Sequence, residues 1–168
     1  NETSQKIDLG GADLIEATLY KADLGSANLY GATLYRADLR QANLRGADLR
    51  GAILYGAVLE NANLYRADLG NANLSRANLY AADLTEAKLI GANLANAKLI
   101  GTILHEAILT QATLTQALMY DADLTFADLR GADLRGSNSH SAKVYGAKID
   151  NSMAITIVKS IGVTIKGV

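Results

Sequence analysis

Several residue types that often mark functional sites are missing from this sequence. Its 168 residues include no cysteine, no proline and no tryptophan, and only one phenylalanine. Without cysteine the chain can form neither disulfides nor thiolate metal sites, although this does not fix its redox compartment. No apolar run approaches the roughly 20 residues that span a bilayer, and no signal peptide is recognised. We therefore expect no membrane span.

An excess of charge of one sign is missing as well. The 16 basic and 17 acidic residues give a net charge of −1. Proteins that bind nucleic acid by neutralising phosphates carry a basic excess. The balance of charge therefore argues against a nucleic-acid partner, and equally against a strongly acidic decoy.

What the sequence does have is a leucine at every fifth residue from residue 9 to residue 134. Of these 26 positions, 25 are leucine and one is Met119. Alanine lies two residues before almost every leucine, and between residues 12 and 132 only Thr102 departs from this rule. The residue between alanine and leucine is mostly Asp or Asn, and the two residues after leucine vary. The chain is a repeat protein.

A period of five residues fits neither a helix nor a flat sheet. In a helix, each step of five advances about 500° and carries the leucines around every face. In a strand it would put successive leucines on opposite faces. The pattern requires short extended pieces with Ala and Leu facing inward, each followed by a two-residue turn. The thirteen glycines between residues 10 and 146 all lie in these turns, where glycine adopts the needed conformations at little steric cost.

Right-angle corners would close one coil every twenty residues. Inward positions carry no charged residue between residues 7 and 153, so the core is filled and leaves no lumen for a ligand. We expect about seven coils with a spacing of about 4.8 Å. No cofactor and no small-molecule substrate are expected.

The repeats resemble the pentapeptide repeat family. The motif stands as Ala-Asp-Leu-Arg-Gly at 47–51 and 132–136, Ala-Asn-Leu-Tyr-Arg at 62–66 and Ala-Asn-Leu-Ser-Arg at 72–76. The resemblance covers about residues 7–153. It implies an all-β fold, the right-handed quadrilateral β-helix, and the handedness comes from the resemblance alone. It says little about activity, because fold is not function.

Three segments are expected. Residues 1–6 form a polar N-terminal segment, and residues 7–153 form the β-helix, with an open coil edge at its N-terminal end and a loosened stretch near 137–141, where serine enters the inward positions. Residues 154–168 are rich in β-branched residues and are expected to cap the column as a hairpin or a pair of strands, with a helix as the alternative.

The compartment stays open. The chain is expected to be soluble, in the cytoplasm, or in the periplasm or thylakoid lumen if the missing initial Met reflects processing.

Tyrosine and arginine are concentrated on the outer wall of the N-terminal coils. Residues twenty apart should lie above one another, which predicts a Tyr35–Tyr55 stack and vertical tyrosine–arginine pairs. Such pairs either stabilise coil stacking or form a binding face. The residues in question are Tyr20, Tyr30, Tyr35, Arg40, Arg45, Arg50, Tyr55 and Tyr65. Because Arg40, Arg45 and Arg50 fall on successive sides, they are expected to form a belt.

A second candidate surface is apolar. Ile53 and Val58 occupy outward places that should be polar, and a further outward set follows between residues 90 and 118. Clustered exposed apolar residues can mark a partner surface. This set comprises Ile90, Ile100, Ile103, Ile108 and Leu118.

A catalytic constellation is lacking, so we do not expect an enzyme. His105 and His140 are interpreted as ordinary surface histidines, and no metal set is expected around them. The leading hypothesis is a non-enzymatic structural or protein-interaction module that presents flat faces to a protein partner, with an end-to-end or face-to-face homodimer among the options. The alternative, which comes from the family resemblance, is a DNA-mimicking inhibitor or protector of a topoisomerase such as gyrase.

Overall fold

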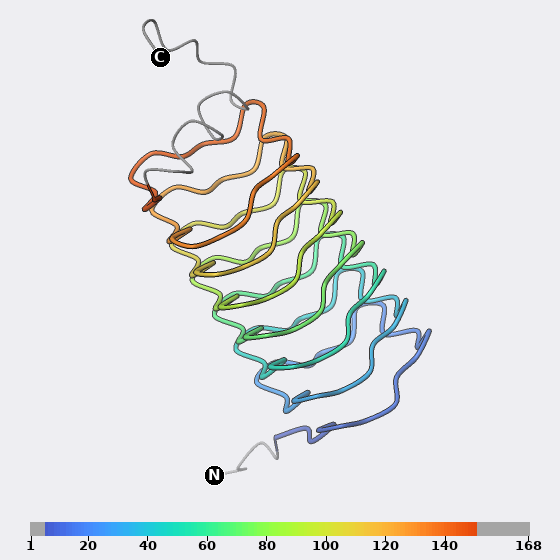
Figure 1. Ribbon diagram of the computed structural model, residues 1–168. Coiled ribbons are helices and arrows are strands. Elements are labelled where there is room, and N and C mark those ends of the chain that lie inside the picture. The colour runs from blue at the N-terminus through green and yellow to red at the C-terminus, as the bar shows by residue number, and fades with distance from the viewer. Residues whose placement is uncertain (1–5, 151–168) are drawn as a thin grey trace, which may run out of the picture.

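The chain winds into a four-sided column of stacked coils, with the first and the last described coil at opposite ends of the column (Figure 1). The computed structural model describes residues 6–150. Each residue between Ala and Leu, here called the outer residue, forms a parallel bridge with the residue twenty positions later, from Asp8↔Asn28 to Asp128↔Lys148. Twenty residues per coil and five per repeat give four sides, which confirms the predicted quadrilateral β-helix. Residues 6–150 form no helix, and each side contributes one bridging residue rather than a longer strand.

Backbone hydrogen bonds follow one scheme in each repeat, as residues 28–32 show. The N–H groups of Leu29 and Gly31 donate to carbonyl oxygens nineteen residues later, at 2.7 and 2.9 Å. The N–H of Asn28 donates to the preceding coil at 2.8 Å, and that of Ala32 closes the turn on Leu29 at 3.0 Å. Coil stacking thus satisfies most buried backbone groups, as buried polar groups require.

The fifth N–H of the repeat explains why outer residues are mostly Asp or Asn. The N–H of the residue after leucine, here called the first turn residue, points away from the coil-to-coil bonds. In the repeat at 28–32 it belongs to Tyr30 and donates to Oδ1 of Asn28 at 3.1 Å. The same Asx cap recurs along the column, for example from Ala95 to Asn93 at 3.0 Å and from Thr85 to Asp83 at 2.9 Å. Asx side chains commonly bond the backbone two residues on.

The corners are turns with a left-handed residue. Every second turn residue from Gly11 to Gly146, in steps of five, has a positive φ, and eighteen of these residues are not glycine. A positive φ at the third residue of a turn closed by an i to i+3 hydrogen bond is typical of a type II turn. Glycine is therefore favoured at the corners but does not define them.

Leucine and alanine fill the interior without a lumen. Inward residues from Leu24 to Leu134 are almost completely buried, Met119 and Thr102 included. At the N-terminal end Leu9, Leu14 and Leu19 are only partly buried, as the predicted open coil edge requires.

The predicted loosening near 137–141 is wrong. The register continues through Leu118↔Asn138 and Asp123↔Lys143, and Ser139 is buried. The Ser137 hydroxyl donates to the carbonyl oxygen of Leu134 at 2.7 Å. Serine fits because the backbone bonds between coils fix the register whatever the inward side chain.

The predicted cap at 154–168 lies outside the described residues. Within residues 6–150, no helix has the length and apolarity needed to cross a membrane.

Candidate interaction surface

The coil register distributes the predicted tyrosine–arginine residues around the column. First turn residues at 20 and 40 share one corner, those at 30 and 50 a second, those at 45 and 65 a third, and Tyr35 and Tyr55 the fourth. The structure therefore brings these residues together in pairs and not on one face. The arginine belt is confirmed.

The predicted vertical contacts are present. Guanidinium carbons lie 5.1–5.6 Å from the ring centroids in three pairs: Arg40 over Tyr20, Arg45 over Tyr65 and Arg50 over Tyr30. At exposed sites such cation–π contacts contribute about 0.5–1 kcal/mol each. Part of the tyrosine–arginine pattern thus serves coil stacking.

Two of these arginines are also neutralised by their own repeat. Arg40 donates from Nε and Nη2 to the two carboxylate oxygens of Asp38, at 2.8 and 2.6 Å. Arg50 does the same with Asp48, at 2.8 and 2.7 Å. The hydrogen bonds from the guanidiniums lower the pKa of both carboxyl groups. These arginines offer little free charge to a partner.

Tyr65 belongs to a second closed network. Its hydroxyl donates to Oε1 of Glu86 at 2.9 Å, and Arg66 donates from Nε to Oε2 of the same carboxylate at 2.7 Å. The bond to Glu86 raises the pKa of Tyr65, whereas the bond from Arg66 lowers the pKa of Glu86. Arg45 lies on this tyrosine ring, so its charge faces a site that already contains a carboxylate.

The remaining corner is built differently, and we call it the Tyr35 corner; its first turn residues run from 15 to 135 in steps of twenty. The rings of Tyr35 and Tyr55 stack with centroids 5.5 Å apart and an interplanar angle of 5°. Arg36 lies over the Tyr35 ring at 5.1 Å and Arg76 over the Tyr55 ring at 5.7 Å. Gly56 separates the two arginines along the corner and leaves room for the Arg36 stem, because an added Cβ would lie 3.4 Å from Arg36 Cγ.

Among residues 6–150, neither arginine of this stack has an acidic partner. Five of the eight arginines form ion pairs, namely Arg40, Arg50, Arg66, Arg130 and Arg135. In the described part of the chain Arg36, Arg45 and Arg76 form none within 4.0 Å. Two of these three flank the tyrosine stack, so positive charge is concentrated there.

The two tyrosines of this stack lack the Asx cap. Thr33 and Ile53 are the outer residues before the two tyrosines, and across residues 6–150 the N–H groups of Tyr35 and Tyr55 donate to no protein acceptor. On the next side Val58 also replaces Asp or Asn. Ile53 is 41% exposed, so apolar side chains adjoin the aromatic stack on both sides of the corner.

The apolar set at 90–118 divides over several sides. Ile90 and Ile108 lie near one another along one face, Ile100 and Leu118 along another, and Ile103 on a third. Ile90, Ile103 and Leu118 are 44%, 42% and 36% exposed. The structure therefore does not bring the five residues together.

The histidines show no catalytic arrangement. His105 Nδ1 lies 2.7 Å from the Thr125 hydroxyl, which in turn donates to Asp123, and the ring packs edge-on against Phe126 at 5.7 Å. Nε2 faces Glu106 at 3.4 Å. Among the described residues no three His, Cys, Asp or Glu side chains are placed to hold a metal ion.

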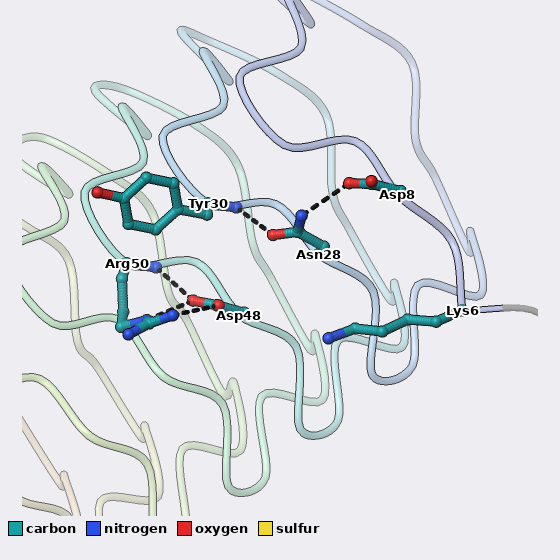
Figure 2. Close-up of a pocket in the computed structure, with 6 residues that line it drawn as sticks. All are labelled: Lys6, Asp8, Asn28, Tyr30, Asp48 and Arg50. Carbon is teal, nitrogen blue, oxygen red and sulfur yellow. Dashed lines mark hydrogen bonds and ion pairs between the residues drawn. The ribbon is translucent and has the colours of Figure 1, made fainter.

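A shallow depression near the N-terminal end is also self-neutralised. Figure 2 shows its lining, in which Asn28 donates to Asp8 at 2.7 Å and Arg50 forms an ion pair with Asp48. The Lys6 side chain extends over the same face and contributes to the lowered pKa of Asp48. Because Asp8, Asn28, Asp48 and Arg50 already have partners, this depression is not a ligand site of the kind that convergent free donors would form.

The placement of Arg36 and Arg76 against the tyrosines escaped sequence reasoning. The rule that residues twenty apart lie above one another predicts contacts between coils. Arg36 instead contacts Tyr35, the residue directly before it, and its own backbone is left-handed. The available signal was the dipeptide Tyr-Arg at the two turn positions, at 35–36 and again at 65–66.

Comparison with known proteins agrees with this architecture. A family model described as pentapeptide repeats, in 8 copies, matches residues 7–46, 42–79, 77–116 and 117–152. No curated protein sequence matches the chain.

Solved structures that are similar to this chain include two other pentapeptide repeat proteins and a fluoroquinolone resistance protein. HetL, a pentapeptide repeat protein involved in heterocyst differentiation regulation in the cyanobacterium Nostoc sp. strain PCC 7120, is 30% identical, covers 84% of each chain and has a TM-score of 0.34. A pentapeptide repeat protein of the Arabidopsis thaliana thylakoid lumen is 27% identical, covers 86% of this chain and 81% of that chain and has a TM-score of 0.32. Trypsin-treated QnrB1, a plasmid-mediated fluoroquinolone resistance protein, is 21% identical over 94% of this chain and 85% of that chain, with a TM-score of 0.51. At that identity the likeness to QnrB1 shows the fold alone.

Proposed function

The chain belongs to the pentapeptide repeat family, and from this premise we propose that it is a non-enzymatic protein-interaction module. Membership brings with it the right-handed quadrilateral β-helix. In that fold leucine and alanine occupy the interior, and recognition has to take place on the outer wall or at the ends of the column. Function therefore depends on surface residues that the column does not itself require.

The observation that carries the proposal is the composition of the Tyr35 corner. Stacked tyrosines, arginines without acidic partners and exposed Ile53 lie next to one another there. Tyrosine and arginine are enriched among the residues that dominate binding energy at protein interfaces. Elsewhere on the N-terminal wall Arg40, Arg50 and Arg66 are each paired with a carboxylate, so this corner is the best-equipped part of it.

Two measurements test the proposal. Affinity purification of the tagged chain from its native cells should recover a protein partner, and light scattering over a range of concentrations should show whether that partner is a second copy. A Tyr35→Ser/Tyr55→Ser variant should lose the partner, whereas Tyr145→Ser, which removes an exposed tyrosine elsewhere, should keep it. A strict monomer that retains no partner would overturn the proposal.

The alternative of a DNA-mimicking topoisomerase protector is not favoured by the outer wall. A DNA mimic needs a continuous negative surface, but this chain has a net charge of −1 and bears arginines at all four corners of its N-terminal half. A gyrase supercoiling assay at micromolar protein would reveal such an activity directly.

A further inference from the structure

We infer that the Tyr35 corner binds an acidic segment of the partner protein, one in which carboxylates alternate with apolar side chains. The inference rests on the proposed function and specifies the chemistry of the partner. It follows from four features of this corner: its charge, its missing caps, the contacts of its tyrosine rings and the apolar side chains beside them.

The charge comes from Arg36 and Arg76. Both guanidiniums lie against tyrosine rings, and neither has a carboxylate within 4.0 Å among residues 6–150. Of the nearby acidic residues, Asp38 is held by Arg40, and Glu16 lies one coil before Arg36 on the same corner without forming an ion pair to it. A partner carboxylate would therefore meet two cations whose charge is not already matched.

The missing caps leave backbone N–H donors that also favour an acidic partner. In most repeats an Asp or Asn oxygen accepts the N–H of the first turn residue, as Asn73 does for Ser75 in the same corner at 3.1 Å. At Tyr35 and Tyr55 the outer residues are Thr33 and Ile53, and these two N–H groups have no protein acceptor in the described structure. Acceptor oxygens from a partner are the groups that complete this pattern, and charge-assisted bonds of this kind are the stronger ones.

The contacts of the two tyrosine rings argue against a nucleic-acid partner. Proteins that bind single strands stack bases on exposed aromatic faces. Here each tyrosine ring already contacts the other tyrosine and a guanidinium, which is that of Arg36 for Tyr35 and that of Arg76 for Tyr55. Ring surface in contact with these groups is not open to a base, so the corner favours carboxylates over bases.

Apolar contacts complete the preference. Ile53, on one side of the corner, is 41% exposed, and Val58 lies on the other side of Tyr55. A purely anionic ligand such as phosphate would leave these side chains uncovered. A segment with both acidic and apolar residues covers them while it reaches the arginines.

Selection from a library of random dodecapeptides displayed on phage tests the inference. Three proteins serve as bait: the full chain, the variant Arg36→Gln/Arg76→Gln and the variant Arg130→Gln/Arg135→Gln. Arg130→Gln/Arg135→Gln is the control variant. It loses the same amount of charge, but from guanidiniums that are paired with Asp128 and Asp133. Circular dichroism should show all three folded.

We expect the selected peptides to be enriched in Asp and Glu together with apolar residues. Synthetic copies should bind Arg36→Gln/Arg76→Gln about tenfold more weakly and the control variant about as well as the unaltered chain. Peptides without acidic enrichment, no selected peptides, or equal binding to the two variants would each overturn the inference. So would tight binding of single-stranded oligonucleotides that the same double variant abolishes.

Failure of this inference is distinguishable from failure of the proposed function. A native partner retained by Arg36→Gln/Arg76→Gln would leave the interaction module intact and place its site elsewhere. A chain with no partner at all would remove both.

Discussion

The hydroxyl of Thr102 donates a hydrogen bond to the carbonyl oxygen of Leu79, 2.7 Å away inside the column. Thr102 is the one departure from alanine among the positions two before each leucine from 12 to 132, and it is completely buried. The Leu79 carbonyl also accepts the N–H of Ala82 that closes its own turn, at 3.0 Å. A polar side chain is therefore tolerated in the core because the column supplies an acceptor in reach of it, as buried hydroxyls require.

Replacement of Thr102 by Val should lower the free energy of unfolding by about 1 kcal/mol, since one buried hydrogen bond is lost without leaving the Leu79 carbonyl unpaired. Urea unfolding measures the effect. Thr113→Val is the control, because no hydrogen bond of the Thr113 hydroxyl is found among residues 6–150 and the residue lies on the outer wall. If both variants changed stability equally, the hydrogen bond would not be the cause.

The left-handed corners predict opposite effects of one exchange at neighbouring positions. Ala81 has φ 52° and Gly101, twenty residues later on the same corner, has φ 63°. A left-handed residue with a side chain costs about 1–2 kcal/mol, partly offset by about 0.4–1 kcal/mol of glycine's chain entropy. Ala81→Gly should thus stabilise the protein by about 0.5–1 kcal/mol. Gly101→Ala should destabilise it by a similar amount. An added Cβ meets nothing within 4 Å, so the loss comes from the left-handed backbone and not from a clash.

Ala95 provides the matched control for this pair, because it is a first turn residue and does not have a positive φ. Ala95→Gly should destabilise the protein by about 0.5–1 kcal/mol. Thermal or urea unfolding of the three variants compares the signs. If Ala81→Gly and Ala95→Gly both lowered the free energy of unfolding, strain at the left-handed turn residues would not affect the stability of this column.

The Asx caps predict that outer Asn residues stabilise the fold and outer Ile residues do not. Asn93→Val removes the acceptor of the Ala95 N–H and should lower the free energy of unfolding by about 1 kcal/mol, as loss of a helix N-cap does. Ile103→Asn would supply an acceptor to the His105 N–H and should raise it by about 0.5 kcal/mol, since Ile103 is already 42% exposed. An Ile103→Asn protein less stable than the unaltered chain would contradict the capping role.

The fold was predictable because inward positions obey one rule. With Leu and Ala every five residues and no charge among them, a coil with right-angle corners and twenty residues buries the whole set, and the bridges follow that register. The same rule predicted Arg40 over Tyr20 and the Tyr35–Tyr55 stack, because residues twenty apart are one coil spacing apart.

Contacts within a repeat were not predictable from the period. The ion pair between Arg40 and Asp38, two residues apart, forms across a turn and depends on side-chain rotamers. The contact of Arg36 with Tyr35 depends on a left-handed backbone at residue 36. The period gives the register of ladders, but the candidate site consists of departures from the repeat whose geometry is local.

At the Asp133–Arg135 pair, the effect of the ion pair on the pKa of the carboxylate can be separated from the effect of the Asx cap. Nε and Nη2 of Arg135 donate to Asp133 at 2.9 and 2.6 Å, and the Arg135 N–H donates to Oδ1 at 3.1 Å. The side-chain bonds, then the backbone bond, lower the pKa of Asp133 in the folded protein. A lowered folded pKa means that the pair stabilises the fold above the unfolded pKa of about 3.9 and that this contribution disappears as pH falls through the folded pKa.

Arg135→Gln should raise the pKa of Asp133, as followed by carboxyl carbon NMR during an acid titration. The rise should be incomplete, because glutamine keeps the backbone N–H that caps the carboxylate. Because the Arg135 side chain is 85% exposed, we expect little change in overall stability, which makes the titration the sharper measurement. A pKa of Asp133 that stays unchanged in Arg135→Gln would assign its depression to the cap alone, and the surface ion pairs of the repeat would then contribute nothing to the acid stability of the column.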